Sequence, residues 1–228
     1  LDLFVGHYRT EPKLFKQLPD HSFVDISAKS GLMDIKEIAF ASFFDMDLDG
    51  LLDFYAGRNQ DRAKTRPSLD GQNGEPNRMF RNLGGGRFEP FFGGSITTDR
   101  GDSTGWSLAG ISFDIQNDGY PDLFVANDFG QDRLYANLAG KKLREVGEQI
   151  GVFDRGAGMN ASVVDINEDG YWDLYVTMID MFNKNVSFVL PKHDSKIPLT
   201  DRLLSTTSYL SGNKLLVNDK GSAFHAAE

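Results

Sequence analysis

Three nine-residue segments share one pattern of acidic residues along the chain. They are Asp45-Met-Asp-Leu-Asp-Gly-Leu-Leu-Asp53, Asp114-Ile-Gln-Asn-Asp-Gly-Tyr-Pro-Asp122 and Asp165-Ile-Asn-Glu-Asp-Gly-Tyr-Trp-Asp173. Apolar runs of the kind found in strands precede them at Ile38–Phe44, Leu108–Phe113 and Ala161–Val164, and further apolar runs follow them. A pattern that recurs in this way indicates a repeat architecture. The sequence therefore predicts a repeated unit in which an acidic loop joins two strands.

A second motif alternates with the acidic loops. Its four copies are residues 13–16, 78–82, 133–137 and 214–218, and each is followed by a short polar or glycine-containing turn and an apolar residue. Gly84-Gly85-Gly86 is the clearest of these turns. A strand, a tight turn and a second strand form a β-hairpin. The second motif therefore adds two strands to each unit.

Four short strands in a unit of about 50 residues are typical of a β-propeller blade. We expect an all-β chain with about four such blades, in units of approximately 1–50, 51–119, 120–170 and 171–228. The spacing of the motifs places insertions of about 14 and about 30 residues near 57–76 and 179–212. A propeller usually closes with four to eight blades, so the chain is expected to form an incomplete ring.

The acidic loops are predicted to bind calcium. Side-chain oxygens at positions 1, 3, 5 and 9, with the backbone carbonyl of position 7, suit a hard cation that takes six to eight oxygen ligands. Glycine at position 6 allows the positive φ that wraps the loop around an ion. The predicted ligands are Asp45, Asp47, Asp49, Leu51 and Asp53; Asp114, Gln116, Asp118, Tyr120 and Asp122; and Asp165, Asn167, Asp169, Tyr171 and Asp173.

Asp2 is expected to be the last ligand of a fourth, truncated loop. The opening residues Leu1-Asp2-Leu3-Phe4-Val5 match Pro121-Asp122-Leu123-Phe124-Val125. Three complete sites are therefore expected, and three Ca²⁺ ions would reduce the formal net charge from −9 to about −3.

Other interpretations of the loops are less consistent with the sequence. An EF-hand requires an acidic residue at position 12, where this chain has Ala56, Val125 and Val176. Magnesium is disfavoured because it demands tight octahedral geometry and keeps its waters. Zinc lacks its usual ligands, because there is no cysteine and the four histidines are scattered. Asx turns without metal remain the structural alternative, although several carboxylates in one short loop would repel one another.

Composition excludes some classes of function. The net charge of −9 argues against a nucleic-acid partner, which requires a basic surface. No apolar run is long enough to span a membrane as a helix. Without cysteine there can be no disulfide bonds or thiolate metal sites.

The loop pattern resembles the FG-GAP/VCBS repeats found in the propellers of integrin α subunits. The additional segments Asn77-Arg-Met-Phe-Arg-Asn82 and Gly105-Trp-Ser-Leu-Ala-Gly-Ile111 look closer to the ASPIC/UnbV-type proteins, which include cartilage acidic protein. The resemblance covers the chain apart from the two insertions. It implies a calcium-stabilised, seven-bladed propeller outside the cytoplasm, extracellular or periplasmic. Gln116 departs from the acidic pattern and weakens the expectation for the middle site.

Three hypotheses for function follow. The first is a non-catalytic scaffold that contacts a protein or glycan through its loops and insertions. The second is a propeller domain of a carbohydrate-active enzyme, such as a polysaccharide lyase or dehydratase, although no catalytic constellation is visible. The third is a structural subunit of a larger extracellular assembly. The RGD at 100–102, the G-x-S-x-G around Ser103 and the sequons at Asn160 and Asn185 are weaker motifs.

Overall fold

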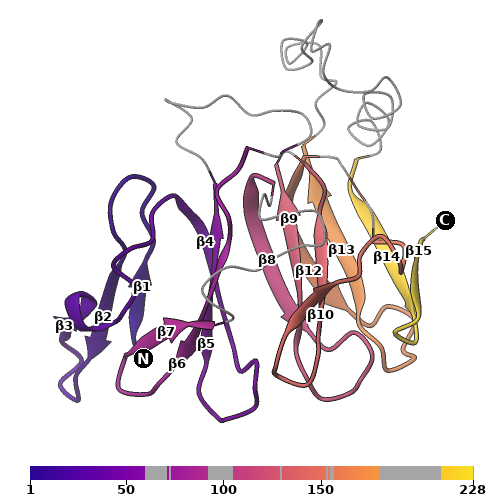
Figure 1. Ribbon diagram of the computed structural model, residues 1–228. Helices are drawn as coiled ribbons and strands as arrows, with labels where there is room; N and C mark the ends of the chain where they lie inside the picture. The colour runs from indigo at the N-terminus through magenta and orange to yellow at the C-terminus, as the bar shows by residue number, and fades with distance from the viewer. Residues whose placement is uncertain are drawn as a thin grey trace, which may run out of the picture.

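The structure, a computed structural model, describes residues 1–59, 71, 73–91, 105–128, 130–152, 154, 157–179 and 212–227. These residues form four antiparallel β-sheets that follow one another in sequence and stand side by side (Figure 1). A short 3-10 helix, η1 (Ser27–Lys29), follows the first sheet. Nowhere in these ranges is there a helix that is long and apolar enough to cross a membrane.

The first sheet has three strands and the other three sheets have four each. In chain order the strands of the four sheets are β1 (Leu3–Val5), β2 (Lys13–Gln17) and β3 (Phe23–Asp25); β4 (Ile38–Phe44), β5 (Asp53–Arg58), β6 (Arg78–Asn82) and β7 (Phe88–Pro90); β8 (Ser107–Phe113), β9 (Asp122–Asn127), β10 (Arg133–Asn137) and β11 (Leu143–Glu145); and β12 (Gly158–Val164), β13 (Asp173–Met178), β14 (Lys214–Asp219) and β15 (Ala223–Ala226).

Each four-stranded sheet is a meander in which every strand pairs with the next one in sequence. Their first strands, β4, β8 and β12, are neighbours, since β8 contacts both β4 and β12. Consecutive meanders that place their first strands together are the blades of a partial β-propeller. The predicted all-β fold and the four predicted hairpins are confirmed.

The hydrogen-bonded sheets are offset by one strand from the units counted along the sequence. The strand before each acidic loop pairs with the strand after it, so each loop connects two strands of the same sheet and does not connect one sheet to the next. β1 pairs with β2 as β5 pairs with β6, so β1 corresponds to the second strand of the other sheets. Of the two predicted insertions, residues 60–70, 72 and 180–211 lie outside the described part of the chain.

Separate apolar clusters join neighbouring sheets. Alternate residues of one strand face opposite ways, so Phe54 packs toward the first sheet and Tyr55 toward the third. In the same way Leu123 packs toward the second sheet and Phe124 toward the fourth. All four side chains are buried. Strands buried on both faces explain why these segments are continuously apolar instead of alternating with polar residues.

Candidate metal centres

The three acidic loops join β4 to β5, β8 to β9 and β12 to β13. Their backbones share two positive φ angles. The sixth residues, Gly50, Gly119 and Gly170, have φ of 86°, 91° and 88°, as the sequence predicts. The fourth residues, Leu48, Asn117 and Glu168, have φ of 60°, 57° and 57°. This second turn into the left-handed region was not predicted, because none of the three fourth residues is a glycine.

The carboxylates at positions 1 and 5 hold each loop in this conformation. Asp45 accepts hydrogen bonds from the N–H groups of Asp49 and Gly50 at 3.1 and 2.9 Å, and Asp49 accepts one from Leu51 at 2.9 Å. The same bonds recur in the other two loops. All three loops therefore have one geometry despite their different sequences.

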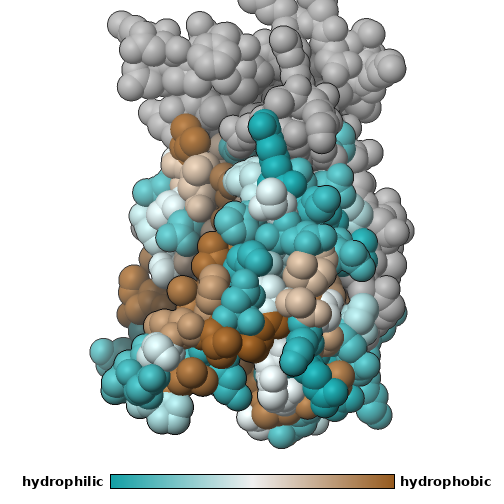
Figure 2. All heavy atoms as spheres, turned by 90° about the vertical axis from the view of Figure 1, so that its left-hand side faces the viewer, coloured by the Kyte–Doolittle hydropathy of each residue, from teal (hydrophilic) through white to brown (hydrophobic). Residues whose placement is uncertain are grey.

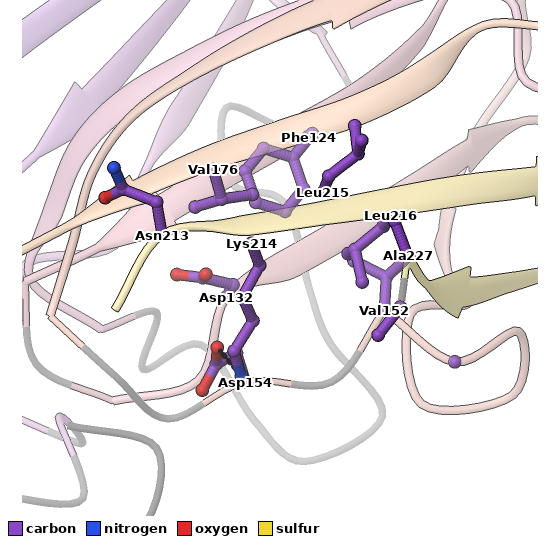
Figure 3. Close-up of a pocket in the computed structure, with 12 residues that line it drawn as sticks. Phe124, Asp132, Val152, Asp154, Val176, Asn213, Lys214, Leu215, Leu216 and Ala227 are labelled. Atoms are coloured by element: carbon purple, nitrogen blue, oxygen red, sulfur yellow. Dashed lines mark ion pairs between the residues drawn. The ribbon is translucent and has the colours of Figure 1, made fainter. Parts of the chain in front are cut away.

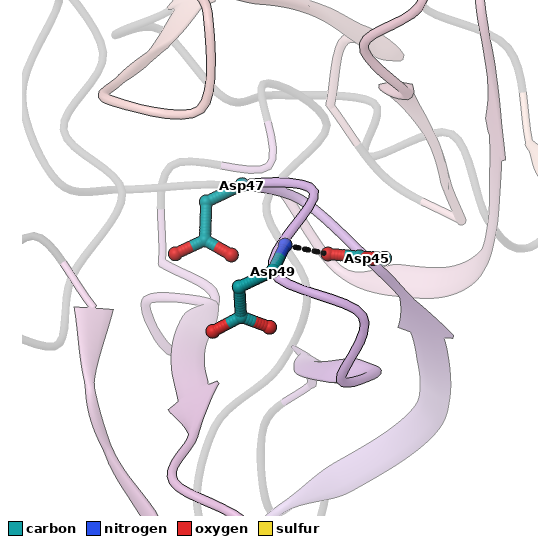
Figure 4. Close-up of side chains that lie close together, drawn as sticks. All are labelled: Asp45, Asp47 and Asp49. Atoms are coloured by element: carbon teal, nitrogen blue, oxygen red, sulfur yellow. Dashed lines mark hydrogen bonds between the residues drawn. The ribbon is translucent and has the colours of Figure 1, made fainter.

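In the first loop the acidic side chains converge. One carboxylate oxygen from each of Asp45, Asp47 and Asp49 lies within 4.8 Å of the other two (Figure 4). The Oδ1 atom of Asp47 is buried and has no hydrogen-bond partner, and its Oδ2 atom lies 2.7 Å from the guanidinium of Arg81. A buried carboxylate oxygen without a donor is costly unless a cation or water meets it. These residues fit a hard cation with oxygen ligands.

In the second and third loops an amide replaces the carboxylate at position 3. Gln116 Nε2 donates to Asp118 at 2.9 Å, and Asn167 Nδ2 donates to Asp169 at 3.2 Å. An amide can also present its oxygen to a cation. In these two loops the side chains of positions 3 and 5 are therefore in contact, and the carboxylate of position 1 accepts a hydrogen bond from the backbone of position 5.

The carboxylate at position 9 also has a second role. Asp53 accepts hydrogen bonds from the N–H groups of Met46, at 3.0 Å, and Asn82, at 2.9 Å. Asp122 and Asp173 bond in the same way to their own loops and to Asn137 and Asn218. These carboxylates tie the acidic loop to the third strand of the sheet. Their role as metal ligands stays a prediction, since a carboxylate accepts more than two bonds.

Burial raises the pKa of two of these carboxylates. Burial, the largest cause, raises the pKa of Asp53 to about 6. The hydrogen bonds from Asn82 and Met46 lower this pKa, and the nearby carboxylates of Asp47 and Asp49 raise it by a smaller amount. For Asp122 the pKa rises to about 7 for the same reasons. Without a metal ion, the first and second loops thus hold the charge of these carboxylates at a cost in free energy.

Comparison with known families identifies the repeat. Residues 114–176 match the FG-GAP-like repeat. This segment begins at the first residue of the second acidic loop and includes the whole third loop. The finer resemblance to ASPIC/UnbV-type proteins stays a prediction. No curated protein matches the chain by sequence.

Among solved structures, the chain is similar to BBS1N in its crystal structure in complex with ARL6DN. The identity is 12% and the TM-score is 0.40. The similarity covers 77% of this chain and 52% of the other, so this chain spans about half the length of the structure that it matches.

The first and second acidic loops also contact the following sheet. Asn137 Nδ2 in the third sheet donates to the Met46 carbonyl of the first loop at 2.9 Å. Asn218 in the fourth sheet bonds to the Ile115 carbonyl of the second loop at the same distance. Asn117 of the second loop bonds to the Gly170 carbonyl of the third. The loops therefore lie at the junctions between sheets.

Sequence reasoning missed these junction residues. Asparagine ends three of the four copies of the second motif, and this recurrence was the available signal. Nothing comparable indicated Arg81, because the matching positions in the other two sheets are Ala136 and Val217.

The weaker candidates are placed as follows. Asp2 accepts a hydrogen bond from the Gln17 N–H at 3.0 Å, as Asp53 does from Asn82, which supports its predicted equivalence to the ninth loop position. Asn160 is exposed on β12. The RGD at 100–102, Ser103 and Asn185 lie outside the described residues.

Proposed function

We propose that this chain is part of a calcium-stabilised propeller that acts outside the cytoplasm as a non-catalytic binding or scaffold module. Ca²⁺ binds the three acidic loops and fixes the sheets. The loops and insertions contact a protein or glycan, in an adhesion-type role. Millimolar extracytoplasmic calcium is in the range that fills sites of this kind.

One observation carries the calcium part of the proposal. Asp45, Asp47 and Asp49 bring three carboxylates together around a buried oxygen that lacks a donor. The same backbone conformation recurs in the other two loops. Three similar oxygen-lined loops at corresponding places in successive sheets are better explained by a common ligand than by three independent Asx turns.

The position of the loops explains how calcium would stabilise the fold. The backbone of each of the first two loops accepts a hydrogen bond from the asparagine of the next sheet. An ion that fixes the loop therefore also fixes this junction. Because the unfolded chain lacks the site, binding raises the free energy of unfolding by mass action.

Exposed apolar side chains on the first sheet favour a second candidate function, a structural subunit of a larger assembly. Figure 2 shows apolar atoms among polar ones on the side of the molecule where the first sheet lies. Exposed apolar side chains of the sheet and its turn include Leu3, Leu18, Phe23 and Val24. Sedimentation of the purified chain across a concentration series tests this candidate: self-association favours it, and a monomer at every concentration contradicts self-assembly.

Thermal unfolding tests the calcium proposal. Excess CaCl₂ is expected to raise the Tm of the 228-residue chain by several degrees over EDTA, and MgCl₂ to raise it less. Asp49→Asn is expected to reduce the calcium-dependent shift, whereas the exposed control Asp20→Asn is expected to keep it. Equal melting curves in calcium and EDTA would refute the proposal.

A further inference from the structure

A cavity of about 400 Å³ lies between the third and fourth sheets, away from the acidic loops. Its apolar wall includes Phe124, Val152, Val176 and Leu216 (Figure 3). Asp132, Asp154 and Lys214 line its polar end, where β10 and β14 begin. This volume and this mixture of apolar wall and few polar groups are typical of small-molecule sites.

The repeat provides an internal comparison for the cavity. In the second sheet, Asn77 accepts a hydrogen bond from the Arg58 N–H and donates to the Tyr55 hydroxyl. In the fourth sheet, Asn213 makes the same two bonds with the Met178 N–H and the Tyr175 hydroxyl. An Asn–Tyr pair therefore closes this position in two of the three four-stranded sheets.

The third sheet differs at both members of the pair. Asp132 replaces the asparagine and Phe124 replaces the tyrosine, so the carboxylate has no hydroxyl partner within its own sheet. The neighbouring sheet also differs. Ser107, which receives a hydrogen bond from Asn77, corresponds to Gly158, which has no side chain. These three differences together leave the cavity.

The negative charge of Asp132 is not required for the hydrogen bond that its side chain makes to the backbone. Its Oδ1 atom accepts the Asn127 N–H at 2.8 Å, which a neutral asparagine does in the other two sheets. No described residue donates a hydrogen bond to Oδ2 or forms an ion pair with Asp132, which is only 2% exposed. Lys214 forms its ion pair with Asp154 instead. The three ionisable groups of the cavity thus have a formal charge of −1.

We propose that this cavity binds a small organic cation. An ammonium or guanidinium group pairs with Asp132 Oδ2, and the apolar part of the ligand packs against Phe124 and Val176. A buried carboxylate gains most from a cation that also excludes water from the site. The proposal does not depend on calcium in the acidic loops.

Calorimetric titration of the full chain with phenethylamine, at constant calcium, tests the proposal. Phenethylamine is expected to bind at one site with at least tenfold higher affinity than the neutral 2-phenylethanol or the anionic 3-phenylpropionate. Asp132→Asn keeps the backbone hydrogen bond and removes the charge, so it is expected to weaken binding at least tenfold. Glu89→Gln, which changes an exposed acid elsewhere, is expected to bind as the wild type does.

The double variant Asp132→Asn with Phe124→Tyr recreates the Asn–Tyr pair of the other two sheets. It is expected to fold, by circular dichroism, and to bind no phenethylamine, which separates loss of the site from loss of structure. Undiminished binding by Asp132→Asn, equal binding of 2-phenylethanol, or no saturable binding of phenethylamine by the wild type would overturn the proposal.

Discussion

Arg81 distinguishes the first acidic loop from the other two. This loop has four carboxylates where each of the others has three and an amide at its predicted side-chain ligand positions. Arg81 lies on β6, the third strand of the same sheet. Its guanidinium is 2.7 Å from the Asp47 carboxylate and 3.4 Å from the Asp49 carboxylate. Arginine therefore offsets the additional charge, so the three loops carry nearly the same net charge toward an ion.

Arg81→Gln is expected to strengthen calcium binding at the first loop. Removing the cation destabilises the calcium-free loop, whereas Ca²⁺ neutralises the loaded one. Competition with a fluorescent chelator should show roughly threefold or greater tightening at one site. Arg87→Gln, an exposed control in the same hairpin, should leave all sites unchanged. Weaker binding in Arg81→Gln would mean that Arg81 acts mainly by positioning Asp47.

Asp132 predicts a specific pH dependence of stability in the ligand-free protein. Burial, the largest cause, raises its pKa well above the ordinary value, despite the hydrogen bond from Asn127. A raised pKa means that the folded chain holds a proton that the unfolded chain has released. The stabilising contribution is therefore complete at acidic pH, below the unfolded pKa, and is lost as pH rises through the folded pKa.

Asp132→Asn removes this dependence, since an amide does not titrate. The variant is expected to exceed the wild type in free energy of unfolding at neutral pH, with a smaller difference at pH 4. Urea denaturation of the wild type and the variant at a series of pH values measures the difference in free energy of unfolding at each pH. A difference that grows toward acidic pH would contradict a raised pKa for the buried Asp132 carboxyl.

At the scale of the elements, the hairpin turns between third and fourth strands bring sheets together. Gly140 and Gly221 are equivalent and have φ of 72° and 78°. A Cβ at Gly140 would lie 2.8 Å from the Asp47 Cα atom, and one at Gly221 would lie 2.7 Å from that of Gln116. Each turn therefore packs against the acidic loop of the preceding sheet. Gly85 occupies the same position in its own turn, with φ of 64° and open space around it.

Gly140→Ala and Gly85→Ala form a matched pair for this packing. Both introduce a side chain at positive φ, which costs roughly 1 kcal/mol. Only Gly140→Ala also forces a loop and a turn apart, which adds about 1–3 kcal/mol. Chemical denaturation compares their free energies of unfolding. Equal losses in the two variants would show that the close contact between turn and loop does not contribute to stability.

Much of the element level was predictable from the sequence. Residues such as Phe54 and Phe124 lie in apolar runs bounded by acidic loops and turns, and both features are local. The ties between sheets were not predictable, because they depend on which sheets are neighbours. Asn137 and its partner Met46 are 91 residues apart. The cavity was not predictable from the sequence either, because it arises from three residue differences on two neighbouring sheets.

For the whole molecule, the acidic loops and the sheet junctions are one system. Apolar clusters join successive sheets on both faces of the second and third, and polar ties at the loops fix their mutual position. Calcium is therefore expected to protect whole sheets and not only the loops.

Hydrogen exchange measures whether calcium protects whole sheets or only the acidic loops. Calcium should slow exchange of backbone amides in β10 and β14, which bond to acidic loops through Asn137 and Asn218. The exposed turn at Leu18–Ser22 should exchange at the same rate with and without calcium. Protection confined to the acidic loops would limit calcium to a local role.

We expect each of the three acidic loops to bind one calcium ion. Calorimetric titration of calcium into the metal-free chain, analysed for stoichiometry, tests it most directly. The expected result is three ions per chain, and two in each of the variants Asp49→Asn, Asp118→Asn and Asp169→Asn. No binding, or a stoichiometry of three that none of these variants changes, would contradict it.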